Sequence, residues 1–144
     1  MQRHKVVPAS YLLLENDNKY LMLRRFNTGY RDGEYSLVSG HGDEGESPRQ
    51  TIIREAREEA GITVSIDNLE LVHIVSRKAK DFERIDFFWH CLKWEGQVAN
   101  IEPHKCDDLS WFSRGNLPEN LVPELQAALA GIAVGDLYSE LNWI

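Results

Sequence analysis

The chain has 144 residues, of which 42% are hydrophobic, and a formal net charge of −7 at neutral pH. This length is close to the usual size of one domain, so we expect a single domain over residues 1–144. The acidic balance argues against binding of duplex nucleic acid, which needs a basic face, and no apolar stretch approaches the length of a membrane span.

The N-terminal segment and the cysteines indicate an intracellular protein. Met1 to Pro8 contains basic residues but no apolar run typical of a secretion signal, so we expect a cytoplasmic location. Cys91 and Cys106 are too few for a disulfide framework and do not form a C-x-x-C metal motif. We expect Cys91 to pack within a strand and Cys106 to lie in a loop.

The first third of the chain has the pattern of a β-hairpin. Val6 to Glu15 and Tyr20 to Arg25 are rich in strand-forming residues, and Asn16-Asp17-Asn18 between them is a typical turn sequence. A loop with Gly29 and Gly33 follows. A short strand from Tyr35 to Val38 then leads into a glycine-rich turn.

A helix is predicted after this turn, from Ser47 to Gly61. Ser47 is a good N-cap, Pro48 suits the first helical position, and Gln50 completes a capping box with Ser47. Gly61 is a typical residue for the end of a helix. The apolar face, which we expect to pack on a sheet, contains Ile52, Ile53, Ala56 and Ala60.

The opposite face of this helix is acidic. Glu58 and Glu59 lie three and four residues after Glu55, so all three carboxylates are neighbours on the helix surface. At about 5–6 Å and an effective dielectric constant of about 20, each pair repels by roughly 3 kcal/mol. A solvated surface is the usual role of such a face. The glycine-rich turn before the helix instead favours a site for a hard cation, Mg²⁺ or Mn²⁺.

The rest of the chain predicts further strands and a second helix. Strands are expected at Leu69 to Ser76, Ile85 to Lys93 and Leu109 to Phe112, with a charged connector from Arg77 to Arg84. A final helix is expected from about Pro123 to Ala130. The tail from Asp136 to Ile144 has apolar residues that we expect to dock on the domain.

The segment from Gly40 to Ile62 resembles the signature of the Nudix hydrolases, which include MutT-like proteins. The signature is G-x5-E-x7-R-E-U-x-E-E-x-G-U, where U is a bulky aliphatic residue, and every fixed position is filled, with the small Ala56 at the first U. The resemblance implies an α/β fold, an α/β/α sandwich around a mixed sheet. It also implies Mg²⁺-dependent hydrolysis of a nucleoside diphosphate linked to another moiety, X.

The resemblance also implies roles for individual residues. The metal-binding groups would be Glu55, Glu58, Glu59 and the carbonyl of Gly40, and Arg54 would pair with Glu46 to hold loop and helix together. Water would attack phosphorus, with a glutamate of the signature, such as Glu55 or Glu58, or else Glu102 accepting its proton. Asp107 and Asp108 compete with Glu102 for the role of an additional acidic group.

Three residues outside the acidic face are candidates for substrate binding. Arg24 and Arg25 end a strand, where alternation places neighbouring side chains on opposite faces, so at most one points into a cleft. A solvated strand end is an equally good interpretation of these arginines. His41 lies within the signature and could contact phosphate.

The sequence leaves the substrate open. Nucleoside triphosphates, dinucleoside polyphosphates, nucleotide sugars and ADP-ribose share the group that the signature handles, and the small size of the chain favours a triphosphate. Specificity is expected in the loops Asn27 to Glu34 and Arg77 to Arg84. An alternative is a module that senses a nucleotide or ADP-ribose without turnover. Whether the protein is a monomer or a homodimer is also open.

Overall fold

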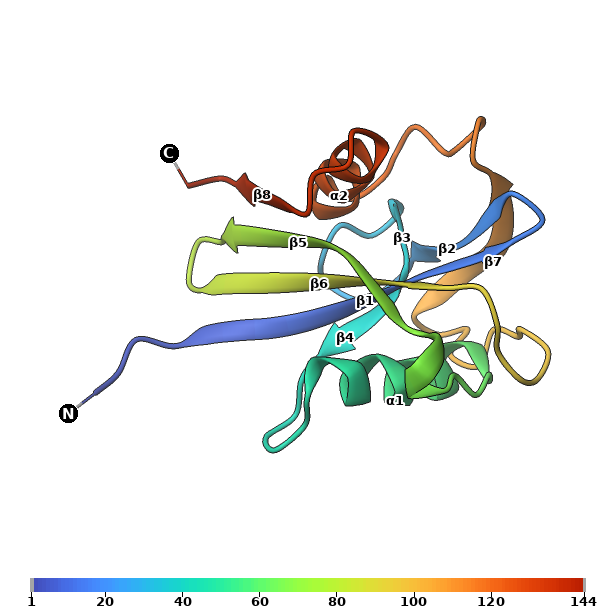
Figure 1. Ribbon diagram of the computed structural model, residues 1–144, viewed down its shortest axis with the longest axis horizontal. Coiled ribbons are helices and arrows are strands. Elements are labelled where there is room, and N and C mark those ends of the chain that lie inside the picture. The colour runs from blue at the N-terminus through green and yellow to red at the C-terminus, as the bar shows by residue number, and fades with distance from the viewer. Residues whose placement is uncertain (1, 144) are drawn as a thin grey trace.

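The computed structural model describes residues 2–143, which form two α-helices and a short 3₁₀ helix around eight strands (Figure 1). The strands are β1 (Val6–Asn16), β2 (Lys19–Arg25), β3 (Tyr35–Ser36), β4 (Val38–His41), β5 (Glu70–Lys78), β6 (Glu83–Cys91), β7 (Cys106–Ser113) and β8 (Tyr138–Leu141). The helices are α1 (Pro48–Ala60), the 3₁₀ helix Ile66–Asn68, and α2 (Pro123–Ala133).

The sheet is mixed and is built around β1. This long strand pairs in parallel with β6 and antiparallel with β4, and its last residues form the predicted hairpin with β2. On the far side of β1, β5 pairs antiparallel with β6 and in parallel with β8. β2, the second strand of the hairpin, pairs antiparallel with both β3 and β7. β1 therefore joins the two halves of the sheet.

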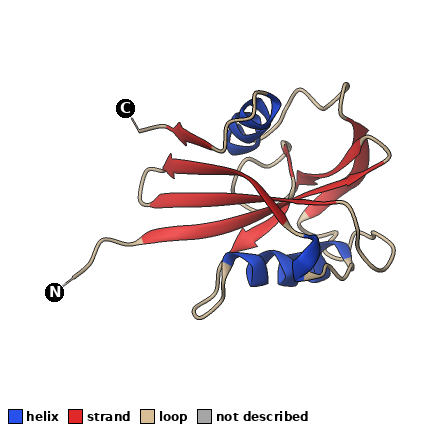
Figure 2. Ribbon diagram, in the orientation of Figure 1, coloured by secondary structure: helices blue, strands red, loops and turns tan. Residues whose placement is uncertain are grey.

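The two faces of the sheet carry separate hydrophobic cores. On β1, Leu12 and Leu14 face the core under α1, whereas Tyr11 and Leu13 face the core under α2. This alternation follows from the period of two in strand side chains. α1 and α2 consequently cover opposite faces of the sheet (Figure 2), which gives the predicted α/β/α sandwich.

The local signals for α1 are confirmed. Ser47 is the N-cap and forms a capping box with Gln50, and Gly61 ends the helix in the left-handed region at a φ of 69°. Ile52 and Ala56 are fully buried against the sheet. The acidic face of α1 is thereby turned toward the edge strand β4.

Three segments differ from the sequence-based expectation. The predicted strand Tyr35 to Val38 is two strands, because β3 pairs with β2 whereas β4 pairs with β1. Cys106 was expected in a loop but begins β7, where it is buried opposite Arg25. Half of the connector expected from Arg77 to Arg84 is strand, because β5 continues to Lys78 and β6 begins at Glu83, and the two arginines face each other in the ladder between these strands.

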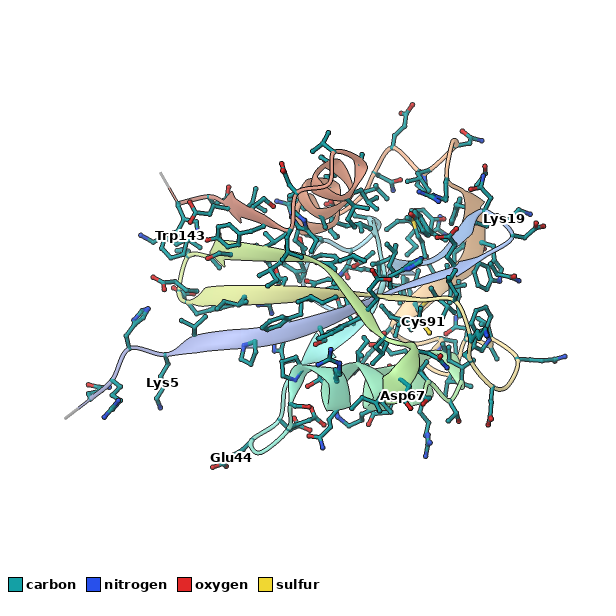
Figure 3. The ribbon with its side chains drawn as sticks, viewed as in Figure 1. Lys5, Lys19, Glu44, Asp67, Cys91 and Trp143 are labelled. Atoms are coloured by element: carbon teal, nitrogen blue, oxygen red, sulfur yellow. The ribbon has the colours of Figure 1, made fainter. Side chains whose placement is uncertain are left out.

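The C-terminal tail docks on the sheet as expected, and it does so as a strand. β8 extends the sheet beside β5, and the indole of Trp143 donates a hydrogen bond of 3.0 Å to the carbonyl of Ser76 (Figure 3). The buried His73 contacts the Asp136 carbonyl at 2.8 Å and the Ser139 hydroxyl at 2.7 Å. Ile144 lies outside the described residues. No helix within residues 2–143 is long and apolar enough to cross a membrane.

Candidate active site

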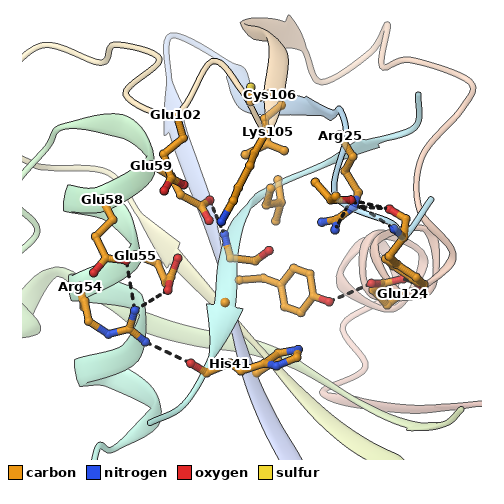
Figure 4. Close-up of a pocket in the computed structure, with 18 of the residues that line it drawn as sticks. Arg25, His41, Arg54, Glu55, Glu58, Glu59, Glu102, Lys105, Cys106 and Glu124 are labelled. Atoms are coloured by element: carbon orange, nitrogen blue, oxygen red, sulfur yellow. Dashed lines mark hydrogen bonds and ion pairs between the residues drawn. The ribbon is translucent and has the colours of Figure 1, made fainter. Parts of the chain in front are cut away.

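A pocket of about 620 Å³ opens beside β4, between the acidic face of α1 and the first turn of α2 (Figure 4). The glutamates of α1 lie on one side of it, and Arg25 and Glu124 lie on the other side. Its lining includes Tyr11, Arg25, Tyr30, Ser39, Gly40, His41, Arg54, Glu55, Glu58, Glu59, Arg84, Glu102, Lys105 and Glu124. The pocket thus combines an acidic wall with a wall that carries arginines and tyrosines.

Alternation along β4 explains why one pocket has two different walls. Gly40 faces α1, because a Cβ atom added to Gly40 would overlap the carboxyl group of Glu55. Residues 39 and 41 face the other way, and the ring of His41 points away from the glutamates (Figure 4). The edge strand β4 therefore separates the acidic wall from the arginine-bearing wall, and the pocket is open to both.

The acidic wall contains the three glutamates that the sequence analysis placed on one helical face. Glu59 accepts a hydrogen bond of 3.1 Å from the backbone N–H of Ser39, and Glu55 lies over Gly40. Glu58 is more exposed and accepts a hydrogen bond from Arg54 at 3.2 Å. The helix and the strand thus bring the three carboxylates and the backbone of β4 into one wall.

Arg54 links the glycine-rich loop to the helix. It donates two hydrogen bonds to Glu46, from Nε at 2.8 Å and from an Nη at 3.0 Å, and a third to the carbonyl of His41 at 3.0 Å. Such paired bonds between a guanidinium and a carboxylate are strong and directional. They hold the pKa of Glu46 at about 2, well below its usual range.

The carboxylates nearest β4 are poorly suited to carry full negative charge by themselves. Burial, together with a hydrogen bond and charge repulsion from Glu55, raises the pKa of Glu59 well above its usual value. Burial also raises the pKa of Glu55, although Arg54 opposes the change. Close carboxylates of this kind favour sharing a proton, or binding a cation in its place.

The donor atoms of this wall fit a hard divalent cation. Carboxylate oxygens are its main donors, and Gly40 lacks the side chain that would fill the space beside Glu55. Within residues 2–143, no group of three His, Cys, Asp or Glu side chains is arranged to hold a metal ion as it stands. Arg54 donates to both Glu55, at 2.5 Å, and Glu58. These bonds engage Oε1 of Glu55 and Oε2 of Glu58, so the second oxygen of each carboxylate is not bonded to Arg54.

The two strand-end arginines lie in different places. Arg25 lines the pocket, whereas Arg24 pairs with Asp107 at 2.7 Å and lies over the ring of Tyr35. A bulge in the pairing of β2 with β7 falls between the two arginines. Only one of them thus reaches the pocket wall, as strand alternation allows.

Glu102 lies in the pocket, and its two competitors are engaged elsewhere. Glu102 lines the pocket close enough to Glu59 to raise the pKa of that group through charge repulsion. Asp107 pairs with Arg24, and Asp108 accepts hydrogen bonds from Tyr35 and Ser110. Of these three acidic residues, Glu102 is the one that lines the pocket.

The wall opposite the glutamates contains a buried polar cluster that the sequence analysis missed. Glu124, in the first turn of α2, accepts hydrogen bonds from Tyr11 at 2.8 Å and from Tyr30 at 3.2 Å. Arg77 donates to the Tyr30 hydroxyl at 3.0 Å and to Asp86 at 3.0 Å. Burial raises the pKa of Asp86 to about 6, although Arg77 favours its charged form.

Two further basic residues of the pocket were also missed. Lys105 and Arg84 line it, and an Nη of Arg84 contacts Nε2 of His41. Burial, and then the charge of Arg84, lowers the pKa of His41, which favours the neutral form of its ring. The sequence showed Arg84 only as one residue of the charged segment from Arg77 to Arg84. The face of the sheet on which its side chain lies depends on the pairing of β6 with β1.

A model of the NUDIX domain family matches residues 4–131, which is most of the chain. The chain belongs to the Nudix family. The resemblance drawn from the segment Gly40 to Ile62 is therefore confirmed, and the glutamates described above are those of the Nudix signature.

Curated relatives of the Nudix domain are larger proteins. An NAD-capped RNA hydrolase, NudC, of Pseudomonas entomophila (strain L48) is 27% identical over 116 residues, which cover 79% of this chain and 39% of that protein. NudC of Pseudomonas aeruginosa (strain LESB58) is 29% identical over 117 residues, or 81% and 40% of the two chains. The chain thus spans about two fifths of the length of these relatives.

Solved structures of similar size share the fold. A MutT NUDIX hydrolase from Burkholderia pseudomallei superposes with a TM-score of 0.81 at 22% identity, covering 88% of this chain and 98% of that one. The E. coli ORF135 protein gives a TM-score of 0.75 at 25% identity, covering 91% of each chain. Both likenesses agree with the α/β/α sandwich.

Proposed function

We propose that this Nudix domain hydrolyses the pyrophosphate bond of a nucleoside diphosphate linked to X, most readily a nucleoside triphosphate, with Mg²⁺ or Mn²⁺ as cofactor. The observation that carries the proposal is the meeting of Glu55, Glu58 and Glu59 with the backbone of Gly40 in a pocket that also contains Arg25. Carboxylates for a cation and a guanidinium for phosphate are the two chemistries that this reaction needs.

The acidic wall would hold the cation. The proposed ligands are Glu55, Glu58, Glu59 and the carbonyl of Gly40, and a divalent cation held by them would polarise a phosphoryl oxygen and the attacking water. Arg54, through its paired bonds to Glu46, keeps the loop before α1 fixed relative to the helix. This fixed geometry positions the ligands.

The proton of the attacking water would pass to a carboxylate in the pocket. Glu102 is the proposed acceptor, because it lines the pocket and forms no ion pair with a basic side chain among the described residues. Glu55 and Glu58 are the other candidates, since both also line the pocket. Arg25 and His41 would contact the phosphates from the other wall.

The names of the relatives set the range of substrates to test. The NudC relatives are named for NAD-capped RNA, so NAD belongs in the panel beside nucleoside triphosphates, nucleotide sugars, dinucleoside polyphosphates and ADP-ribose.

The proposal is tested by incubating the purified chain with this panel in Mg²⁺ or Mn²⁺ and identifying the products. We expect cleavage of a pyrophosphate bond, and a decrease of at least 100-fold in kcat for Glu58→Gln. A module that only senses nucleotides would bind them without turnover, and its affinity would survive the same substitution. Release of no phosphate-containing product from any member of the panel would refute the enzymatic function.

A further inference from the structure

Two arginines of the pocket have no acidic partner among the described residues. Arg25 and Arg84 both line the pocket, and within residues 2–143 neither forms an ion pair with a carboxylate. Arg24, Arg54 and Arg77, in contrast, each pair with an aspartate or a glutamate. The pocket thus contains two guanidinium groups whose charge is not balanced by a direct contact.

The contacts of these arginines leave hydrogen-bonding capacity toward a ligand. Arg25 donates only to neutral oxygens, the carbonyl of Tyr30 at 2.6 Å and the hydroxyl of Thr28 at 3.0 Å. Arg84 contacts the ring of His41, and its buried Nε has no hydrogen-bond partner among the described groups. A buried donor without a partner is unfavourable, so an acceptor oxygen placed beside Nε of Arg84 would be stabilising.

The fold also places Arg84 next to another positive charge. Arg84 lies directly opposite Arg77 in the ladder between β5 and β6, and like charges at such positions repel. Asp86 is two residues along the same strand and therefore on the same face, but it is bonded to Arg77. Glu124 also lies 3.5 Å from Arg77, so both nearby carboxylates contact Arg77 rather than Arg84.

We propose that Arg84 and Arg25 form a subsite for a phosphate group of the substrate, on the wall of the pocket across from the glutamates. Guanidinium groups present parallel N–H donors that match the oxygens of phosphate. The glutamates would hold, through the cation, the diphosphate that is cleaved. The Arg84 subsite therefore selects substrates with a phosphate beyond that diphosphate, as in nucleoside triphosphates. This inference rests on the proposed function.

Binding of a simple anion tests the subsite without turnover. Inorganic tripolyphosphate is titrated into the purified chain by calorimetry, at low ionic strength with EDTA to remove divalent cations. We expect the dissociation constant to rise at least tenfold in Arg84→Gln and by less in Arg84→Lys, which retains the charge. Arg49→Gln is the matched control, because Arg49 lies on α1 over the ring of Trp89, outside the pocket lining.

Two results of this titration would overturn the subsite. One is the absence of tripolyphosphate binding to the unmodified chain. The other is a dissociation constant for Arg84→Gln that lies within twofold of the value for the unmodified chain. If Arg84→Gln does not fold, as judged by circular dichroism, Arg84→Met is titrated in its place, with the same expected loss of at least tenfold.

A comparison of two substrates tests the specificity. For a nucleoside triphosphate, we expect Arg84→Gln to lower kcat/KM at least tenfold, mainly through KM. For a nucleotide sugar with the same base, which has only the diphosphate, the change should stay within twofold. Equal losses on both substrates would overturn the role in selecting a third phosphate. Absence of turnover by the unmodified chain would refute the proposed function, whereas tripolyphosphate binding would still report on the subsite.

Discussion

The carboxyl group of Glu55 lies directly against the backbone of Gly40. A Cβ atom built on Gly40 would approach within 2.7 Å of Glu55 Cγ and still closer to the carboxyl group. Real Cβ atoms do not make such contacts, so any side chain at position 40 must displace Glu55. The first glycine of the Nudix signature is thus needed because a side chain at this position would fill the space that Glu55 occupies.

We expect Gly40→Ala to lower kcat by about 100-fold while the fold is retained, because a displacement of about 1 Å in a catalytic group has effects of this size. The measurement is steady-state turnover of the best substrate, with circular dichroism to check folding. Gly115→Ala is the matched control, since an added Cβ at Gly115 meets no atom within 4 Å. Equal activity of the two variants would show that the placement of Glu55 is not needed.

Glu46 should contribute to stability in a manner that depends on pH. Its pKa is held at about 2 by Arg54, below the usual 4.5, so the folded state favours the charged carboxylate. The contribution is complete above pH 4.5 and is lost as the pH falls toward 2. We expect Glu46→Gln to lower the free energy of unfolding by about 1–2 kcal/mol at pH 7, and by less near pH 3.

Urea unfolding of Glu46→Gln at several pH values measures this contribution. Glu44→Gln is the control, because Glu44 is exposed at the tip of the same loop (Figure 3). A difference between Glu46→Gln and the unmodified chain that stays constant from pH 7 to pH 3 would contradict the role assigned to the ion pair with Arg54.

The buried cluster across the pocket should depend on the hydroxyl of Tyr11. Tyr11→Phe removes a donor to the buried carboxylate of Glu124, and we expect a loss of about 1–2 kcal/mol in the free energy of unfolding. Tyr20→Phe is the control, since Tyr20 is also buried but its hydroxyl donates no hydrogen bond to another described group. Equal stabilities of the two variants would be evidence against this cluster.

Gly131 of α2 should be required for docking of the C-terminal tail. A Cβ at Gly131 would overlap the ring of His73, whose nitrogens contact Asp136 and Ser139 of the tail. Alanine usually stabilises a helix by about 1 kcal/mol relative to glycine. We expect Gly131→Ala to lower the melting temperature instead and to speed proteolysis within residues 134–143. A rise in melting temperature would contradict the prediction.

The sequence predicted α1 well because its signals are local. Ser47, Gln50 and Gly61 act within one or two turns, and the helix begins and ends where they indicated. The family resemblance supplied the roles that we propose for the glutamates. The same motif also implied the pairing of Arg54 with Glu46, which are eight residues apart.

The opposite wall of the pocket could not be predicted because its contacts are distant in sequence. Tyr11 and Glu124 are separated by 113 positions, and they meet only because α2 covers the face of the sheet to which Tyr11 points. Arg84 likewise reaches His41 across 43 positions, through the pairing of β6 and β4 with β1. Strand alternation was visible in the sequence, but the partners of each strand were not.

Binding of Mn²⁺ tests most directly whether the glutamates of α1 hold the cation. Electron paramagnetic resonance of free Mn²⁺ gives the dissociation constant for the unmodified chain, Glu59→Gln and, as a control on the exposed loop, Glu44→Gln. We expect one tight site that is weakened at least tenfold in Glu59→Gln and is unchanged in Glu44→Gln. Equal affinity of Glu59→Gln and the unmodified chain would contradict the account of this site.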